Sequence, residues 1–201
     1  MSGLDGFLAK SLEEVINKNL GEKTVKRIQD RLFEKFGMSL TQAMEEFDKV
    51  DLVLREFFGK GADGLEKRFF EGIFQSKSKK SKDGWYTLRD ENAASTILQA
   101  FGDPEKKKVL ETVSDTPKII AEIIEECNLP QTSGYRKINS LIDEGLLYKS
   151  GYITRENKKI NQYVSAFSNF RINLENKKMS VDIQITDSDN SSIIQTIKVA
   201  S

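Results

Sequence analysis

Histidine is absent from this 201-residue chain, which removes the usual general base, the commonest metal ligand and the ordinary pH-sensing side chain. The single cysteine, Cys127, can form neither an internal disulfide nor a thiolate cage for a metal. We interpret Cys127 as a small buried hydrophobic residue, with redox sensing as the alternative. Phosphate-binding glycine loops are also missing, because the glycines of residues 59–64 lack the required spacing. We therefore expect no enzymatic activity, no catalytic residues, no metal and no cofactor.

Long hydrophobic runs are missing as well. No stretch approaches the roughly 18 apolar residues of a membrane span, and no signal-peptide pattern opens the chain. These features predict a cytoplasmic protein without a membrane partner.

The net charge is zero, yet residues 1–74 carry 12 basic and 14 acidic side chains, whereas residues 130–178 carry nine basic and four acidic ones. A local positive potential of this kind favours a nucleic-acid partner despite the zero total.

Residues 1–74 are predicted to form a helical domain. Amphipathic stripes indicate helices that end at Gly21 and Gly37, and Ser39 with Gln42 forms a capping box for another. Eight of the twelve phenylalanines lie between Phe33 and Phe74, in a density greater than short helices would obviously bury. A buried core is the favoured interpretation of the aromatic stripe, and a ligand pocket the alternative. We also expect part of the cluster to form a dimer surface.

Residues 75–84 contain four lysines and no hydrophobic residue before Gly84, which predicts a flexible linker. A basic arm on the DNA backbone is the alternative interpretation. The second domain is expected to start at Trp85, with a short strand and then a helix over about residues 90–101. Residues 187–201 are predicted to be a frayed tail.

Residues 103–167 contain the order helix, helix, turn, helix and hairpin that is typical of a winged helix-turn-helix. Asp103-Pro104-Glu105 supplies an N-cap, a proline at the first helical position and an acid in the first turn. The second helix is expected to carry a stripe that includes Ile119, and Asn128 and Pro130 end it. The third helix is predicted from about Pro130 to Glu144, followed by Gly145 at its C′ position.

Two pairs of strands are predicted after the third helix. Residues 146–153 and 162–167 flank a polar, cationic turn, as a wing requires. Residues 170–174 and 181–185 then alternate between apolar and polar residues, and we expect them to extend the wing sheet. The predicted fold class is mainly α with a small antiparallel β component, in a helical domain followed by a winged helix-turn-helix domain.

Residues 103–167 resemble the winged-helix DNA-binding domains of archaeal ArsR- and MarR-like regulators. The resemblance covers about a third of the chain and rests on Gly102-Asp103-Pro104-Glu105-Lys106, Tyr135-Arg136-Lys137-Ile138 and Gly145-Leu146-Leu147. Similar regulators carry an extra strand and helix before the DNA-binding helices, which implies a DNA-binding domain over about residues 85–186. Residues 32–73 are similar to small helical domains common in archaeal proteins, which have no established chemistry.

The third helix and the wing supply the candidate DNA-contacting residues. The first turns of the helix carry hydrogen-bonding and cationic side chains suited to base edges and phosphates. Base contacts are expected from Gln131, Thr132, Ser133 and Arg136, and backbone contacts from Tyr135 and Lys137, with a core position as the alternative for Tyr135. The wing is expected to touch phosphate or the minor groove through Arg155, Lys158 and Lys159.

These residues predict a transcriptional regulator that binds duplex DNA in a sequence-specific manner as a homodimer. The helical domain is expected to dimerise, to sense a signal or to contact another protein. The alternative is an interaction protein whose winged helix docks a protein partner and does not bind DNA. A protein-docking version should not need Arg136, Lys137 and the basic wing tip together.

Overall fold

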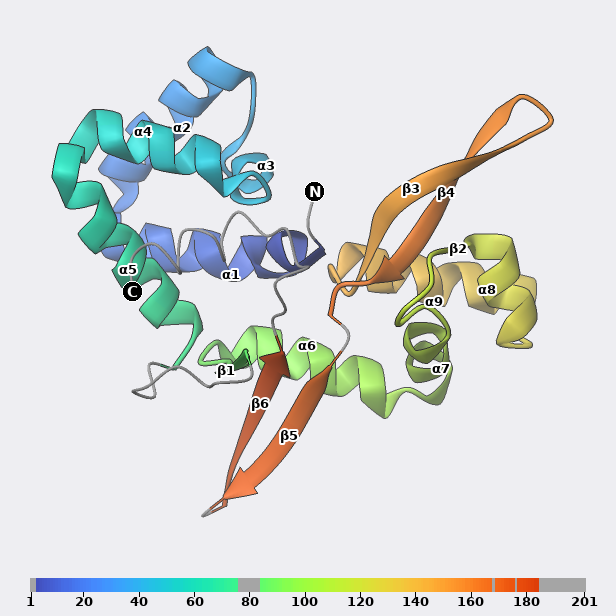
Figure 1. Ribbon diagram of the computed structural model, residues 1–201. Helices are drawn as coiled ribbons and strands as arrows, with labels where there is room; N and C mark the ends of the chain where they lie inside the picture. Colours follow the sequence, from blue (N-terminus) through green and yellow to red (C-terminus); the bar gives the residue numbers. More distant parts are fainter. Residues whose placement is uncertain (1–2, 76–83, 168, 176, 185–201) are drawn as a thin grey trace.

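The structure is a computed structural model that describes residues 3–75, 84–167, 169–175 and 177–184. It confirms the predicted fold class, since helices dominate and two small antiparallel sheets accompany them (Figure 1). The predicted tail, residues 187–201, lies outside the described residues, as do residues 76–83 of the predicted linker with their four lysines. The first lobe consists of α1 (Gly3–Leu20), α2 (Glu22–Phe36), α3 (Leu40–Met44), α4 (Phe47–Phe58), η1 (Gly59–Gly61) and α5 (Ala62–Ile73).

Local sequence signals set the ends of the helices in this helical lobe. The Ser39 hydroxyl accepts from the Gln42 backbone N–H at 3.2 Å, and the Gln42 side chain accepts from the Ser39 backbone N–H at 2.9 Å, which confirms the capping box. Gly37 adopts a left-handed conformation and donates its N–H to the Phe33 carbonyl at 2.8 Å. These two caps turn the chain sharply between α2 and α3.

The phenylalanines of the helical lobe are mostly interior. Phe47, Phe69, Phe70 and Phe74 are buried, and Phe33 alone among the eight between residues 33 and 74 is largely exposed, at 69%. Of the residues expected to contribute to a dimer surface, only Phe33 is therefore largely exposed, and the dimer itself stays a prediction. The helices cross closely enough to enclose the rings, as the 5.5 Å between the ring centroids of Phe47 and Phe70 shows.

One carboxyl group is buried in the same lobe. Glu66 of α5 is 1% exposed, and its Oε1 has no hydrogen-bond partner among the described residues. Burial raises the pKa of Glu66 to about 8, and the neighbouring carboxyl of Asp51 on α4 adds to the rise. Glu66 is therefore protonated at neutral pH, which avoids an uncompensated buried charge.

The remaining described elements form two separate sheets and four helices around them. α6 (Glu91–Gly102) begins at the cap Asp90, whose carboxylate accepts from the backbone N–H groups of Asn92 and Ala93 at 2.7 and 3.1 Å. The winged helix follows as α7 (Pro104–Thr112), β2 (Lys118–Ile119), α8 (Ile120–Glu126), α9 (Gln131–Asp143), β3 (Leu147–Arg155) and β4 (Lys158–Ser165). Its sheet has the order β2-β4-β3. Ile119, expected in the second helix, instead belongs to β2 and pairs with Gln162 of β4.

The last two strands were wrongly predicted to extend the wing sheet. β5 (Phe170–Glu175) and β6 (Lys178–Gln184) pair instead with β1 (Trp85–Thr87), in a separate sheet of order β1-β6-β5. Phe170 at the start of β5 packs against α6 rather than the wing, with 4.2 Å between the ring centroids of Phe170 and Phe101. The wing and the β5–β6 hairpin accordingly project from the body in different directions (Figure 1).

The two predicted domains share one hydrophobic core that runs from Leu4 to Ile183. The start of the predicted linker lies beside β1, because Gln75 donates its backbone N–H to the Thr87 carbonyl at 2.9 Å. Helix α1 packs directly against the winged helix: a Cβ at Gly145 would lie 2.9 Å from the Phe7 Cα, and Gly145 has a φ of +73°. Glycine at 145 thus serves both the predicted helix stop and this close contact.

Candidate nucleic-acid interface

The turn between α8 and α9 sets the position of the third helix of the winged helix. Asn128 takes a positive φ of 51°, and Leu129 donates its N–H to the Ile124 carbonyl at 3.0 Å. Gly134 is buried where the helices cross, and a Cβ there would lie 2.8 Å from the Ile124 Cγ1. Any larger residue at 134 would push α8 and α9 apart, so the sequence fixes a close crossing.

One side of α9 faces solvent and carries the polar side chains expected of a DNA-reading helix. The buried side consists of Gly134, Ile138 and Leu141. The opposite side repeats at helical spacing. We call it the α9 stripe, and its members are Gln131, Thr132, Tyr135, Arg136 and Asn139.

Four of the predicted base- and backbone-contacting residues thus lie together on the α9 stripe. Tyr135 is 46% exposed, so its aromatic ring is not part of the core. Asn139 was missed, although it lies three residues after Arg136 and four after Tyr135, the spacing that places residues on one helix face. Its amide group donates and accepts hydrogen bonds, as base edges require.

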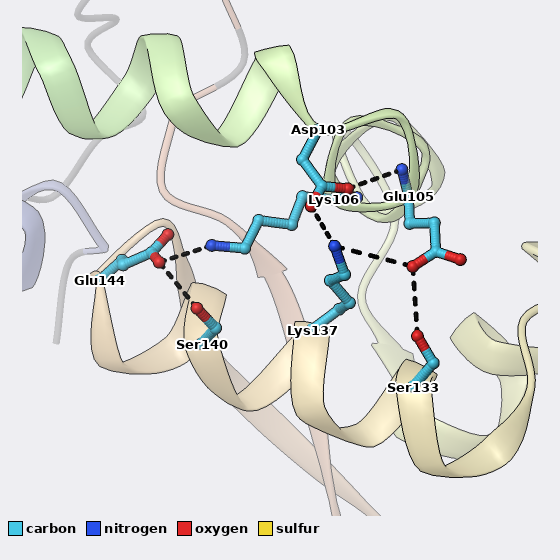
Figure 2. Close-up of polar contacts among 7 residues, drawn as sticks. All are labelled: Asp103, Glu105, Lys106, Ser133, Lys137, Ser140 and Glu144. Carbon is cyan, nitrogen blue, oxygen red and sulfur yellow. Dashed lines mark hydrogen bonds and ion pairs between the residues drawn. The ribbon is translucent and has the colours of Figure 1, made fainter.

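Two other predicted residues, Ser133 and Lys137, point away from this stripe. Figure 2 shows both side chains directed at the start of α7. Lys137 forms an ion pair with Asp103 and lies 3.7 Å from Glu105, and the Ser133 hydroxyl donates to Glu105 at 3.2 Å. The side chain of Lys137 is only 19% exposed. Lys137 and Ser133 therefore attach α9 to α7 rather than present free groups to solvent.

Asp103 links this attachment to the start of α7. Its carboxylate accepts from the backbone N–H groups of Glu105 and Lys106 at 3.0 and 3.2 Å, which confirms the predicted N-cap. The hydrogen bond from Lys137 is the largest of the influences that lower the pKa of Asp103 below its ordinary value. The ionised carboxylate of Asp103 thus caps α7 and forms the ion pair with Lys137 of α9.

A second contact joins the same two helices near the end of α9. The Lys106 ammonium lies 2.5 Å from Glu144, and the Ser140 hydroxyl donates to the same carboxylate oxygen at 2.7 Å (Figure 2). Two attachment points along α9 restrict its rotation about its own axis. The α9 stripe is consequently held in one orientation.

The wing ends in a tight turn at Glu156 and Asn157, with φ values of 48° and 61°. Arg155 pairs with Lys158 across this turn, so both strands run closer to the tip than the sequence indicated. Of the three predicted wing residues, Lys158 is exposed at the tip, and the Lys159 ammonium lies 4.5 Å from the centre of the Tyr152 ring. Arg155 instead donates to Glu122 of α8 at 2.8 Å, although 58% of its side chain is exposed.

The basic residues concentrated between residues 130 and 178 lie in two different parts of the fold, the winged helix and the β5–β6 hairpin. Arg171, Lys177 and Lys178 belong to the β5–β6 hairpin, while residues 103–167 carry ten basic and ten acidic side chains. Part of the acidity comes from α8, where Glu122 pairs with Arg155 and Glu126 with Lys118. The exposed cationic side chains of the α9 stripe and the wing tip are Arg136, Lys158 and Lys159.

An open pocket of ≈ 390 Å³ lies beside the α9 stripe. Helix α8, the turn and α9 contribute side chains to its walls: Ala121, Ile124, Glu125, Asn128, Leu129, Gln131 and Tyr135. Its walls are mixed, because Glu125, Asn128 and Gln131 are polar whereas Ala121, Ile124 and Leu129 are apolar. The exposed carboxylate of Glu125 disfavours a phosphate at this position.

Within the described ranges, no group of three or more acidic or cysteine residues is arranged to hold a metal ion. None of the helices described is both long and apolar enough to span a membrane. No family model matches the chain, and neither the curated proteins nor the solved structures contain a match.

Proposed function

We propose that the protein binds duplex DNA, with the α9 stripe in the major groove and the wing tip against the backbone. The order of α7, β2, α8, α9, β3 and β4 is that of winged-helix DNA-binding domains, which place the third helix in the groove. The observation that carries the proposal is Arg136. It lies in the middle of the stripe and makes no hydrogen bond or ion pair with another described residue.

The neighbours of Arg136 support base recognition. Gln131, Thr132 and Asn139 offer amide and hydroxyl groups on the same side of the helix, and arginine is the commonest reader of guanine edges. Two ion pairs, Lys137 with Asp103 and Lys106 with Glu144, connect α9 to α7 and support the orientation of this surface. We infer a regulator of transcription from this surface, in line with the resemblance of the winged-helix motifs.

The experiment that tests the proposal is a fluorescence-anisotropy titration of the full chain against random-sequence duplex DNA over a series of salt concentrations. Phosphate contacts release condensed counterions, so affinity should fall linearly in a log–log plot against salt. Arg136→Ala should weaken binding, and Arg68→Ala, which removes an equivalent exposed charge from α5, should not. No binding at low salt would contradict the proposal.

A second function, docking of a protein partner, is favoured by one specific observation. The pocket beside α9 combines apolar side chains and the Tyr135 ring with an exposed glutamate, and residues 103–167 have no excess positive charge. Under this alternative, Tyr135→Ala should abolish capture of a partner from cell extract, while the duplex titration shows no binding. The two functions thus give opposite results in the same titration.

A further inference from the structure

Strand β5 forms the outer edge of the sheet ordered β1-β6-β5, and no other described strand lies beside it. Exposed edge strands offer backbone N–H and C=O groups to another chain, and proteins commonly block them with bulges, proline or charge. The ladder from Phe170–Ile183 to Glu175–Lys178 pairs residue for residue, and β5 contains no proline. The β5 edge is therefore open to pairing with a further strand.

The tip of the same hairpin carries a cluster of exposed apolar side chains on one face. Ile172, Leu174 and Met179 are 49%, 75% and 57% exposed, and Leu174 pairs directly with Met179. By contrast, the described part of the helical lobe exposes only Phe33 and Leu52 among its large hydrophobic residues. An exposed apolar cluster next to an open strand edge is typical of an interaction surface.

The sequence of β5 is complementary to itself when two copies run antiparallel. If Asn173 of one copy lies opposite Asn173 of another, Arg171 lies opposite Glu175 and Ile172 opposite Leu174, twice each. Directly opposed residues share a sheet face, so opposite charges meet on one face and apolar side chains on the other. A shift of one residue would place Ile172 against a charged or polar residue, which disfavours that register.

We propose that β5 pairs antiparallel with β5 of a second copy about a twofold axis through Asn173. The pairing joins two three-stranded sheets edge to edge into one continuous sheet. A closed twofold interface satisfies both edges at once and leaves neither open for further addition. This inference does not rest on the proposed DNA function, because it concerns a different hairpin and is read out as molecular mass.

Arg171 provides an internal reporter of the pairing. Its guanidinium lies 3.7 Å from the ring centre of Trp85, the only tryptophan in the chain. To meet Glu175 of a second copy, the guanidinium turns away from this ring toward the outer edge of β5. The fluorescence of Trp85 should consequently change with protein concentration in parallel with the mass.

The test is sedimentation equilibrium of the full chain over a concentration series, with the charges of β5 exchanged. Arg171→Glu alone and Glu175→Arg alone each place like charges opposite one another in the dimer, so each variant should be mostly monomeric. An equimolar mixture of the two restores both opposite-charge pairs and should dimerise again. The double variant R171E/E175R should also dimerise, because its own strands are again complementary.

Two apolar variants serve as a matched pair. Leu174→Lys removes the most exposed apolar contact and should raise the dimer Kd roughly tenfold or more. Leu52→Lys makes the same change on α4, where 48% of the side chain is exposed, and should leave the Kd unchanged. A chain that stays monomeric at all concentrations would overturn the proposal. So would a dimer that persists in Leu174→Lys and dissociates in Leu52→Lys, or a charge-variant mixture that remains monomeric.

Discussion

Lys137 of α9 pairs with Asp103, the residue that caps α7. The pair joins two helices through a carboxylate that already accepts two backbone N–H groups. Lys137 was expected to contact DNA, but its side chain instead connects α9 to α7 and so helps to hold the α9 stripe in its orientation. Substitution of Lys137 should lower the stability of the fold and should affect DNA binding only indirectly.

Lys137→Ala should lower the free energy of unfolding by about 1.5–3 kcal/mol, the range for losing a hydrogen bond to a charged group. The slope of log affinity against log salt should stay the same, because the ammonium releases no counterion from DNA. Urea unfolding and the salt titration measure the two quantities. A flatter salt slope with unchanged stability would mean that Lys137 leaves Asp103 and contacts phosphate.

Asp103 predicts a loss of stability in acid. Because its pKa is lowered in the folded state, it contributes stability above its unfolded pKa of roughly 3.9, and this contribution is lost as the pH falls through the folded pKa. Asp103→Asn keeps a capping side chain and removes the charge. The variant should be less stable than the native chain at pH 6 and approach it near pH 3. Thermal melts across this range give the difference, and a constant gap would contradict the assignment.

Glu66 predicts a pH effect on the other side of neutrality. Its pKa is raised to about 8 in the folded state, so the unfolded chain ionises first and stability falls between roughly pH 4.3 and pH 8. Glu66→Gln replaces the protonated carboxyl by a neutral group of similar shape. The variant should therefore be more stable than the native chain at pH 8 and differ least near pH 4. Equal melting temperatures at pH 8 would show that Glu66 is ionised in the fold.

The wing residues should separate into two kinds in the salt titration. Loss of Lys158 and Lys159 together should flatten the slope by roughly 0.9 for each true phosphate contact. Arg155→Ala should have a smaller effect, because Arg155 is held by Glu122. Glu122→Gln provides the control, since it releases Arg155 and should steepen the slope. An effect of Arg155→Ala larger than that of the double lysine variant would place Arg155 at the centre of the backbone contact.

The order of elements in the winged helix could be predicted because short sequence motifs determine where each of its helices begins and ends. Asp103 caps α7, Asn128 with Pro130 makes the turn, and Gly145 ends α9, each through its own backbone preferences. Exposure along α9 was predicted in part, since Gln131, Thr132 and Arg136 face solvent as their helical spacing indicates.

The errors concern contacts between residues far apart in the sequence. Arg136 and Lys137 are neighbours in the chain, yet the rotation of about 100° per residue sends one to solvent and the other to Asp103, 34 residues earlier. The alternation of Ile172 and Val181 predicted strands but held no information on which sheet they join. That choice depends on α6, whose Phe101 packs against Phe170.

Arg136 provides the most direct test of the proposed DNA interface. After selection of a preferred duplex from a random pool, the affinities of the native chain and of Arg136→Ala are measured for that duplex and for each single-base variant. We expect Arg136→Ala to lose on the order of 1–3 kcal/mol on the preferred duplex and to lose discrimination at one base position. Unchanged affinity and unchanged discrimination at every position would contradict the assignment of the α9 stripe as the DNA-reading surface.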